Sequence, residues 1–308
     1  MNRIKLALGM LLGVCAALTV PNLAGASSAS ATSAPGVDQS GWAARKKIVT
    51  LQNGLRLSYV EAGNPDGEPV LLLHGYTDSS RSWSLMVPHL SRYRLLIPDL
   101  RGHGGTEAPR CCYSLSQFAD DARLFLDALN VRQASVAGHS LGSMVAITLA
   151  ADHPERVSSV ILIGSTALVP VKRGDWLYDN ALALKAPIDP SSQFMRDWHP
   201  ANQPTPVDPV FAEAVRDEFM TIPLHVWRSV MRELASVPVG RHAADVRAPV
   251  LVLSGGKDPL FPPEHHASLL KAFPQAQGQV FAELGHNPNW EQPKALAEAI
   301  DRFLSPKT

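Results

Sequence analysis

One five-residue motif, Gly138-His139-Ser140-Leu141-Gly142, constrains the fold of this chain more than any other feature. It follows the apolar residues 134–137 and precedes residues 143–150, which read as a buried helix. The form Gly-x-Ser-x-Gly is typical of a serine on a sharp turn between a strand and a helix. Glycines two positions either side leave room for the strand and the helix to approach. We therefore predict that the turn presents the Ser140 hydroxyl where a histidine can reach it.

Two more polar residues stand where a serine nucleophile needs its partners, a base and an acid that orients the base. Asp258 follows residues 248–253, an apolar run that reads as a buried strand. His286 follows the short apolar run 279–281 and precedes apolar residues at helical spacing. Catalytic loops gather at the carboxyl ends of parallel strands, so we expect both side chains near Ser140. A plain Asp-Pro turn and a helix-capping histidine are the alternatives.

A further motif, the glycine-rich loop at residues 99–106, follows the apolar run 93–98. The serine, the aspartate and the histidine also occur in that chain order. On these motifs, from about residue 45 to the C-terminus, the chain resembles the α/β-hydrolase superfamily, and within it the capped serine esterase and lipase-like branch. The resemblance implies an α/β-hydrolase fold with a mostly parallel central sheet, flanking helices and a helical cap insertion. It also implies that the loop at 99–106 is structural rather than catalytic.

The resemblance assigns a role to each of the three polar residues. Ser140 would attack an acyl carbon, His286 would take the serine proton, and Asp258 would hold the imidazole in the right tautomer. Water would then hydrolyse the acyl-enzyme. No metal or organic cofactor is implied.

The donors for the oxyanion would be backbone groups. Residues 68–73 are an apolar run, read as a central strand, that ends in His74-Gly75-Tyr76. In the superfamily the loop after this strand supplies one N–H, and the residue after the nucleophile supplies another. The resemblance therefore nominates the N–H groups of Tyr76 and Leu141. Gly75 would let the chain turn so that the amide points inward.

The stretch between residues 163 and 250 is too long for an ordinary crossover helix. Its pattern predicts helices over 176–184, 191–198, 210–220 and 224–234, separated by prolines. This insertion, at about 166–245, resembles the cap of the superfamily. Most of its aromatic residues would pack the cap, and the rest would line an apolar pocket over Ser140. The residues that we expect to contact substrate are His74, Gly75, Trp83, His139, Trp198 and Trp227, with Asp197 and His199 as further candidates.

The N-terminal segment has the pattern of a targeting signal. Arg3 and Lys5 precede the apolar residues 6–20, and Ala24-Gly25-Ala26 fits a cleavage site. The apolar run is short for a membrane span. We expect a signal peptide at 1–26, a flexible lead-in at 27–44 and a hydrolase domain at 45–308. The protein would then be secreted or periplasmic, without stable membrane anchoring.

The charge of the chain argues against nucleic acid as a partner. The 308-residue chain has a formal net charge of zero, with 28 basic and 28 acidic residues, and no basic patch that would favour nucleic acid.

Cys111 and Cys112 are adjacent, and neighbouring Cα atoms are about 3.8 Å apart, below the usual disulfide range, so we expect free thiols. His265 and His266 lie at a polar helix start after Pro262-Pro263, so we expect them to face solvent. We expect no metal site there, since no third ligand is spaced with them.

These features together predict a secreted serine hydrolase that acts on small hydrophobic esters or lactones, with water as the second substrate. Serine at the elbow separates the chain from similar epoxide hydrolases and haloalkane dehalogenases, which use aspartate there. A carbon–carbon bond hydrolase, an acyltransferase and a ligand-binding protein on the same fold are the alternatives, because all of them can retain this triad.

Overall fold

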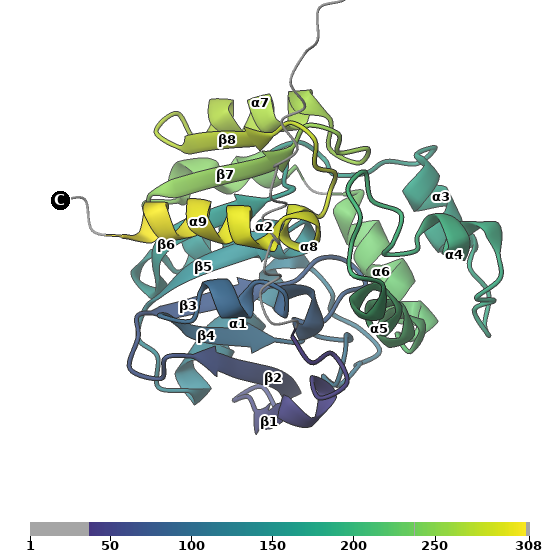
Figure 1. The fold of residues 1–308 in the computed structure, drawn as a ribbon, viewed down its shortest axis with the longest axis horizontal. Helices are drawn as coiled ribbons and strands as arrows, with labels where there is room; N and C mark the ends of the chain where they lie inside the picture. The colour runs from purple at the N-terminus through teal and green to yellow at the C-terminus, as the bar shows by residue number, and fades with distance from the viewer. Residues whose placement is uncertain (1–36, 237, 306–308) are drawn as a thin grey trace, which may run out of the picture. The chain divides into compact units, whose positions relative to one another are not determined.

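The structure, a computed structural model, describes residues 37–236 and 238–305, and within them eight strands form one sheet (Figure 1). The strand order is β1-β2-β4-β3-β5-β6-β7-β8. β1 and β2 pair antiparallel, as do β2 and β4, and the remaining neighbours are parallel. The strands are β1 (Lys47–Thr50), β2 (Arg56–Gly63), β3 (Pro69–Leu73), β4 (Arg94–Pro98), β5 (Ala134–His139), β6 (Val157–Ile163), β7 (Val250–Gly255) and β8 (Gln277–Phe281).

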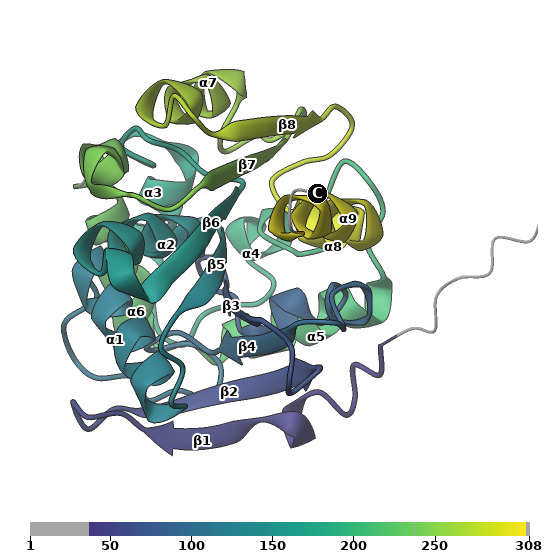
Figure 2. The ribbon, with the colours of Figure 1, turned by 90° about the vertical axis from the view of Figure 1, so that its left-hand side faces the viewer.

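Helices cover both faces of the sheet (Figure 2). One face packs against α1 (Leu115–Ala128), α2 (Leu141–Asp152) and α7 (Pro263–Ala272). The other face packs against α9 (Pro293–Leu304), which follows the short α8 (Pro288–Glu291). In β3, Leu71 and Leu73 belong to the first core and Val70 and Leu72 to the second, because successive side chains of a strand point to opposite faces. The predicted α/β-hydrolase architecture is therefore confirmed.

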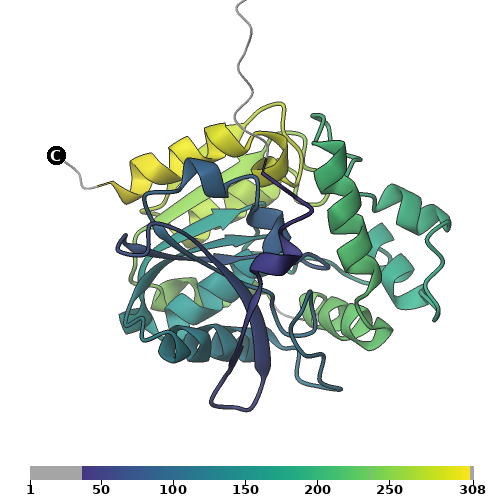
Figure 3. The same ribbon diagram turned by 60° about the horizontal axis from the view of Figure 1, so that its bottom comes forward.

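A helical insertion, residues 164–249, separates β6 from β7. It contains α3 (Trp176–Ala183), α4 (Gln193–Asp197), α5 (Pro209–Met220), α6 (Leu224–Leu234) and a final 3₁₀ segment, Val239–Asp245. Figures 1 and 3 show these helices together on one side of the sheet. Each helix starts and ends within two residues of the range that the sequence predicts; α5 starts one residue early, at Pro209, and α6 matches its predicted range.

Residues 37–44, expected to belong to a flexible lead-in, are instead packed onto the fold. Trp42 is fully buried in the core on the α9 side, and its Nε1 donates to Ser80 Oγ at 3.3 Å. Gln39 is also buried and donates to Ser84 Oγ at 3.0 Å. The expectation of a lead-in that reaches residue 44 is therefore wrong. The predicted signal peptide at 1–26 and residues 27–36 of the lead-in lie outside the described residues.

The loop at residues 99–106 has the structural role that the resemblance implies. Asp99 is fully buried, and its carboxylate accepts from the N–H groups of Ser80 at 2.7 Å and Gly105 at 2.8 Å. Lys46 completes the site with an ion pair of 2.9 Å. The Thr106 hydroxyl donates to the carbonyl of Asp99 at 2.6 Å. This loop therefore ties β4 to the segment before β1 and to the loop after β3.

Cys111 and Cys112 are both free and exposed, as expected. Across residues 37–236 and 238–305, no helix combines the length and the hydrophobicity that crossing a membrane requires.

Candidate active site

Ser140 lies between β5 and α2 in a backbone conformation that is rare for a residue with a side chain. Its φ is 49° and its ψ is −116°, and its N–H donates to the carbonyl of Ile163 at 2.9 Å. A Cβ on Gly138 would overlap the backbone of Gly142, and a Cβ on Gly142 would overlap the carbonyl of Leu73. The two glycines of the motif thus let β5, α2 and β3 meet closely, and the strained turn presents the serine.

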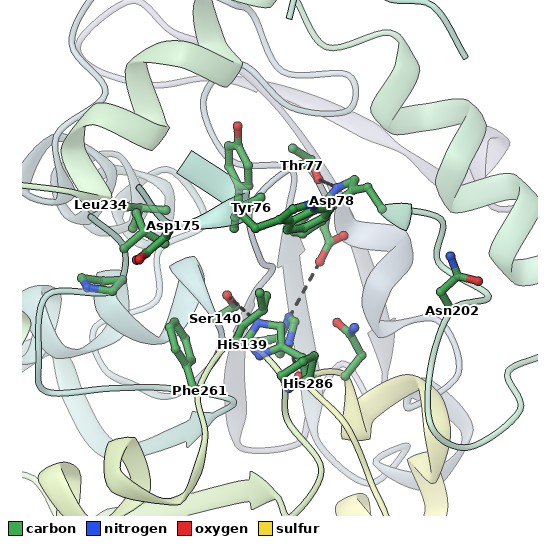
Figure 4. A pocket seen from close by; sticks show the side chains of 18 of the residues that line it. Tyr76, Thr77, Asp78, His139, Ser140, Asp175, Asn202, Leu234, Phe261 and His286 are labelled. Carbon is green, nitrogen blue, oxygen red and sulfur yellow. Dashed lines mark hydrogen bonds and ion pairs between the residues drawn. The ribbon is translucent and has the colours of Figure 1, made fainter. Parts of the chain in front are cut away.

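Ser140, His286 and Asp258 are joined by two hydrogen bonds. The Nε2 of His286 lies 2.9 Å from Ser140 Oγ (Figure 4). Its Nδ1 lies 2.8 Å from Asp258 Oδ2. A carboxylate accepts at Nδ1, so the lone pair of Nε2 faces the serine hydroxyl, as a general base requires. The structure therefore brings together the three residues that the sequence nominates, from the loops after β5, β7 and β8.

Asp258 is held as a carboxylate by the groups around it. Its side chain is 1% exposed, and burial alone would raise its pKa. The positive charge and hydrogen bond of His286, with the N–H groups of Phe261 and Leu260, outweigh burial and lower the pKa of Asp258 below its usual 3.8. Those N–H groups donate to Oδ1 at 2.9 and 2.8 Å. Asp258 can therefore stay charged while it orients His286.

The two nominated oxyanion donors lie at the same corner of the site. Leu141 is the first residue of α2, where N–H groups have no carbonyl partner within the helix. The contact between Gly142 and the end of β3 brings this helix start against the turn that contains Tyr76. The Tyr76 phenol donates to the carbonyl of Trp227 at 2.9 Å, and burial raises the Tyr76 pKa well above its usual value. The Tyr76 side chain is therefore held in place by this hydrogen bond and stays uncharged.

A cavity of about 640 Å³ extends from Ser140 and His286 into the insertion. Aromatic and aliphatic side chains make much of its wall, with a few polar groups among them. The lining includes Tyr76, Asp78, Met144, Phe261 and Asn287 from the loops and helices around the sheet, and Trp176, Trp198, Val215, Phe219 and Leu234 from the insertion. A mostly apolar cavity with a few convergent polar groups is typical of a small-molecule site.

Of the six residues expected to contact substrate, His139 and Trp198 line the cavity, as do the two further candidates, Asp197 and His199. Trp198 donates from Nε1 to Thr77 Oγ1 at 3.0 Å, so the insertion is tied to the loop after β3. His199 Nε2 lies 3.2 Å from the carboxylate of the exposed Glu213 in α5.

Three predicted substrate contacts are wrong, because the described cavity lining does not include them. His74 is fully buried, its Nε2 accepts from the N–H of Leu100 at 2.8 Å, and burial lowers its pKa. Trp83 is fully buried on the α9 side of the sheet. Trp227 is fully buried between the rings of Tyr76 and Phe219. All three are core residues that hold the loops around the site.

Gly75 also lies outside the described lining, and its predicted contact with substrate is wrong. A Cβ at this position would come 2.8 Å from His139 Nδ1 and 2.9 Å from Asp78 Oδ2. Gly75 therefore makes room for these two side chains to face each other.

The structure adds residues that the sequence did not single out. Asp78 is 7% exposed and lines the cavity two residues after Tyr76. His265 was expected to face solvent, but it lines the cavity, stacks on Phe261 and lies 2.7 Å from Thr166 Oγ1. That expectation is wrong because the helix start at Pro263 packs toward the site.

His266, the neighbour of His265, is also partly buried rather than solvent-facing. Its Nδ1 lies 2.8 Å from Ser254 Oγ at the end of β7. Within the described ranges, no group of three or more His, Cys, Asp or Glu side chains is arranged to hold a metal ion.

Comparison with known proteins agrees with the fold that the structure shows. The family model described as "alpha/beta hydrolase fold" matches residues 68–293. This chain belongs to the α/β-hydrolase fold family. Lipase 1 of Psychrobacter immobilis is 30% identical over 270 residues, which are 83% of this chain and 82% of that protein.

Two further similarities illustrate the range of the family. The 2-hydroxymuconate semialdehyde hydrolase of Pseudomonas sp. (strain CF600) is 28% identical over 266 residues, covering 82% of this chain and 91% of that protein. A hydrolase from Pseudomonas aeruginosa PA01 has a similar solved structure, with a TM-score of 0.74 and 24% identity, covering 85% of this chain and 98% of that one. The second similarity supports the fold alone.

Proposed function

We propose that the protein is a serine hydrolase that cleaves neutral carboxylic esters or lactones through an acyl-enzyme. The observation that carries the proposal is the pair of hydrogen bonds, 2.9 Å and 2.8 Å, that links Ser140 Oγ through His286 to Asp258 at the wall of an apolar cavity. Similarity to a lipase supports ester chemistry.

The reaction would proceed in two halves. Ser140 Oγ attacks the carbonyl carbon while His286 Nε2 takes its proton, and Asp258 stabilises the imidazolium. The N–H groups of Tyr76 and Leu141 would stabilise the tetrahedral oxyanion, a contribution of about 3 kcal/mol for each donor in comparable sites. His286 then protonates the leaving alkoxide, and the same histidine activates the water that releases the acid.

The charges around the cavity favour a neutral substrate. Among the described residues that line it, Lys172 is the one lysine or arginine, and it is exposed. Asp175 and Asp197 also line the cavity. A substrate carboxylate that entered would meet no lysine or arginine in the wall other than the exposed Lys172, and an unpaired charge is costly to bury. This argues against the carbon–carbon hydrolase alternative, because the muconate semialdehyde named for the relative carries a carboxylate.

The insertion would serve as the cap of this site, since its side chains form one wall of the cavity. We also propose that residues 1–26 are a cleaved signal peptide, which would place the enzyme outside the cytoplasm. The charge pattern of Arg3 and Lys5 before an apolar run supports this part of the proposal.

Two matched substrates test the proposal directly. Monomethyl adipate differs from dimethyl adipate by one free carboxylate. We expect kcat/KM for the dimethyl ester to be at least about tenfold higher, a ratio that corresponds to only about 1.4 kcal/mol in transition-state stabilisation. Ser140→Ala should abolish both reactions. Retained turnover in Ser140→Ala, or a preference for the anionic half ester, would contradict the proposal.

A further inference from the structure

His139 contacts the proposed catalytic base directly. Its Nε2 lies 2.9 Å from the backbone carbonyl oxygen of His286, and the two rings lie 5.1 Å apart between centroids, tilted by 56°. His139 is 2% exposed. The residue next to the nucleophile in sequence therefore holds the loop of the base, which comes from the far end of the chain.

This contact fixes where one proton of His139 resides. A carbonyl oxygen can only accept, so Nε2 of His139 must carry the hydrogen. Its Nδ1 is buried and has no hydrogen-bond partner among the described residues. The carboxylate of Asp78 lies 3.7 Å from this atom (Figure 4).

The neutral form of the ring is poorly matched to these surroundings. With hydrogen on Nε2 alone, the lone pair of Nδ1 would be aimed at a carboxylate oxygen in a buried position. A second proton on Nδ1 would turn this repulsion into an ion pair and provide the buried nitrogen with a partner. The space for the pair exists because Gly75 has no side chain to separate the two groups.

The other groups around the His139 ring do not supply an alternative partner for Nδ1. The His286 ring packs against it from the loop after β8, and Trp290 of α8 lies 6.3 Å away between centroids. Asp258 is engaged on the opposite side of His286. Asp78, from the loop after β3, is the carboxylate that faces His139.

We propose that Asp78 and His139 form a second acid–imidazolium pair that positions His286 through its backbone carbonyl. His139 carries a proton on both ring nitrogens, one for Asp78 and one for the His286 carbonyl. Both are positioning residues, and the inference rests on the proposed triad. Two Asp–His pairs then meet at the elbow: one orients the imidazole of the base, and the other fixes its main chain.

The protonation state can be observed without any substrate. Long-range ¹H–¹⁵N spectra of the full chain at pH 7 should show both ring nitrogens of His139 in the protonated range, with His139→Gln identifying its signals. In Asp78→Asn, which keeps the shape but removes the charge, one His139 nitrogen should move to the acceptor range. A neutral His139 in the wild-type protein would overturn the proposal.

The positioning role is tested with two variants that both remove the ring. His139→Gln retains an N–H donor of similar reach, whereas His139→Leu retains only volume. We expect His139→Leu to lower kcat for an ester by about 10- to 100-fold with little change in KM, because a small displacement of the base costs this much. His139→Gln should recover most of the loss. Equal kcat in both variants and the wild type would overturn the role.

A fluorophosphonate separates this inference from the proposed function. Its rate of reaction with Ser140 reports how well His286 activates the serine, even if no ester tried is a substrate. We expect slow labelling in His139→Leu and faster labelling in His139→Gln, at equal melting temperatures. If both variants label at the wild-type rate, the proposal fails while the triad stands; if the wild type does not label, the triad fails.

Discussion

Arg81 and Glu218 join the loop after β3 to helix α5 of the insertion. The Nη2 and Nε atoms of Arg81 lie 2.6 and 2.8 Å from Glu218 Oε1, and Ser79 donates to the other carboxylate oxygen. The Arg81 side chain is 6% exposed, and it also donates to the carbonyl of Gln39 at 2.7 Å. The insertion is therefore fastened at α5 to the loop that follows the proposed oxyanion turn.

Removal of this carboxylate should destabilise the protein. Glu218→Ala leaves the buried Arg81 guanidinium without its counterion, and we expect the free energy of unfolding to fall by about 2–3 kcal/mol. This loss is smaller than that for a fully buried ion pair because the Glu218 side chain is 21% exposed. Urea unfolding measures this loss. Glu298→Ala, which breaks the exposed pair with Lys294, is the matched control and should cost less than about 1 kcal/mol. Equal losses in the two variants would contradict this account.

Trp42 should behave as a core residue despite its place near the start of the fold. Trp42→Ala removes a fully buried indole, and we expect a loss of about 3–5 kcal/mol in the free energy of unfolding. Ile48→Ala, six residues later in the chain but 51% exposed, should change the free energy of unfolding by no more than about 0.5 kcal/mol. A Trp42→Ala variant as stable as Ile48→Ala would show that the segment does not contribute to the fold.

Two glycines should respond to alanine for different reasons. In Gly54→Ala the new Cβ meets nothing within 4 Å, so the cost is that of a φ of 85°, about 1–2 kcal/mol. In Gly142→Ala the Cβ overlaps the Leu73 carbonyl, and the helix start must move away from β3. We expect Gly54→Ala to keep its ester turnover and Gly142→Ala to lose it. Turnover per folded molecule, with circular dichroism as the folding check, decides this.

Because the pKa of Asp258 is lowered in the folded protein, we expect the free energy of unfolding to depend on pH. Burial alone would raise its pKa, but His286 and two N–H groups lower it below 3.8, so the folded pKa lies below the unfolded one. Ionised Asp258 therefore contributes stability at neutral pH, and this contribution is lost as the pH falls from about 4 through the folded pKa. Urea unfolding of the wild type and Asp258→Asn should give a difference that shrinks below pH 4. A difference that grows with acidity would contradict the sign.

The triad could be predicted from the sequence because each of its residues stands in a recognisable local pattern. Ser140, Asp258 and His286 each follow an apolar run, and the carboxyl ends of parallel strands share one edge. The insertion helices were also predictable, since prolines separate their apolar stretches.

The wall of the cavity was less predictable for a physical reason. Trp83 and Trp227 look like pocket residues in the sequence, but both are core residues, because hydrophobicity does not tell which side of a loop or helix faces the substrate. The Ser- and Ala-rich composition around residues 27–40 similarly concealed the docking of Gln39 and Trp42. Asp78 and its facing partner His139 depend on a tertiary contact that no local pattern records.

The role of Ser140 as the nucleophile is tested most directly by a mass-spectrometric map of the covalent adduct that forms with a neutral fluorophosphonate. We expect one adduct per chain, on the peptide that contains Ser140, with loss of ester hydrolysis in step with labelling and no adduct in Ser140→Ala. Ester hydrolysis that survives complete labelling of Ser140, or an adduct on another residue, would contradict this role.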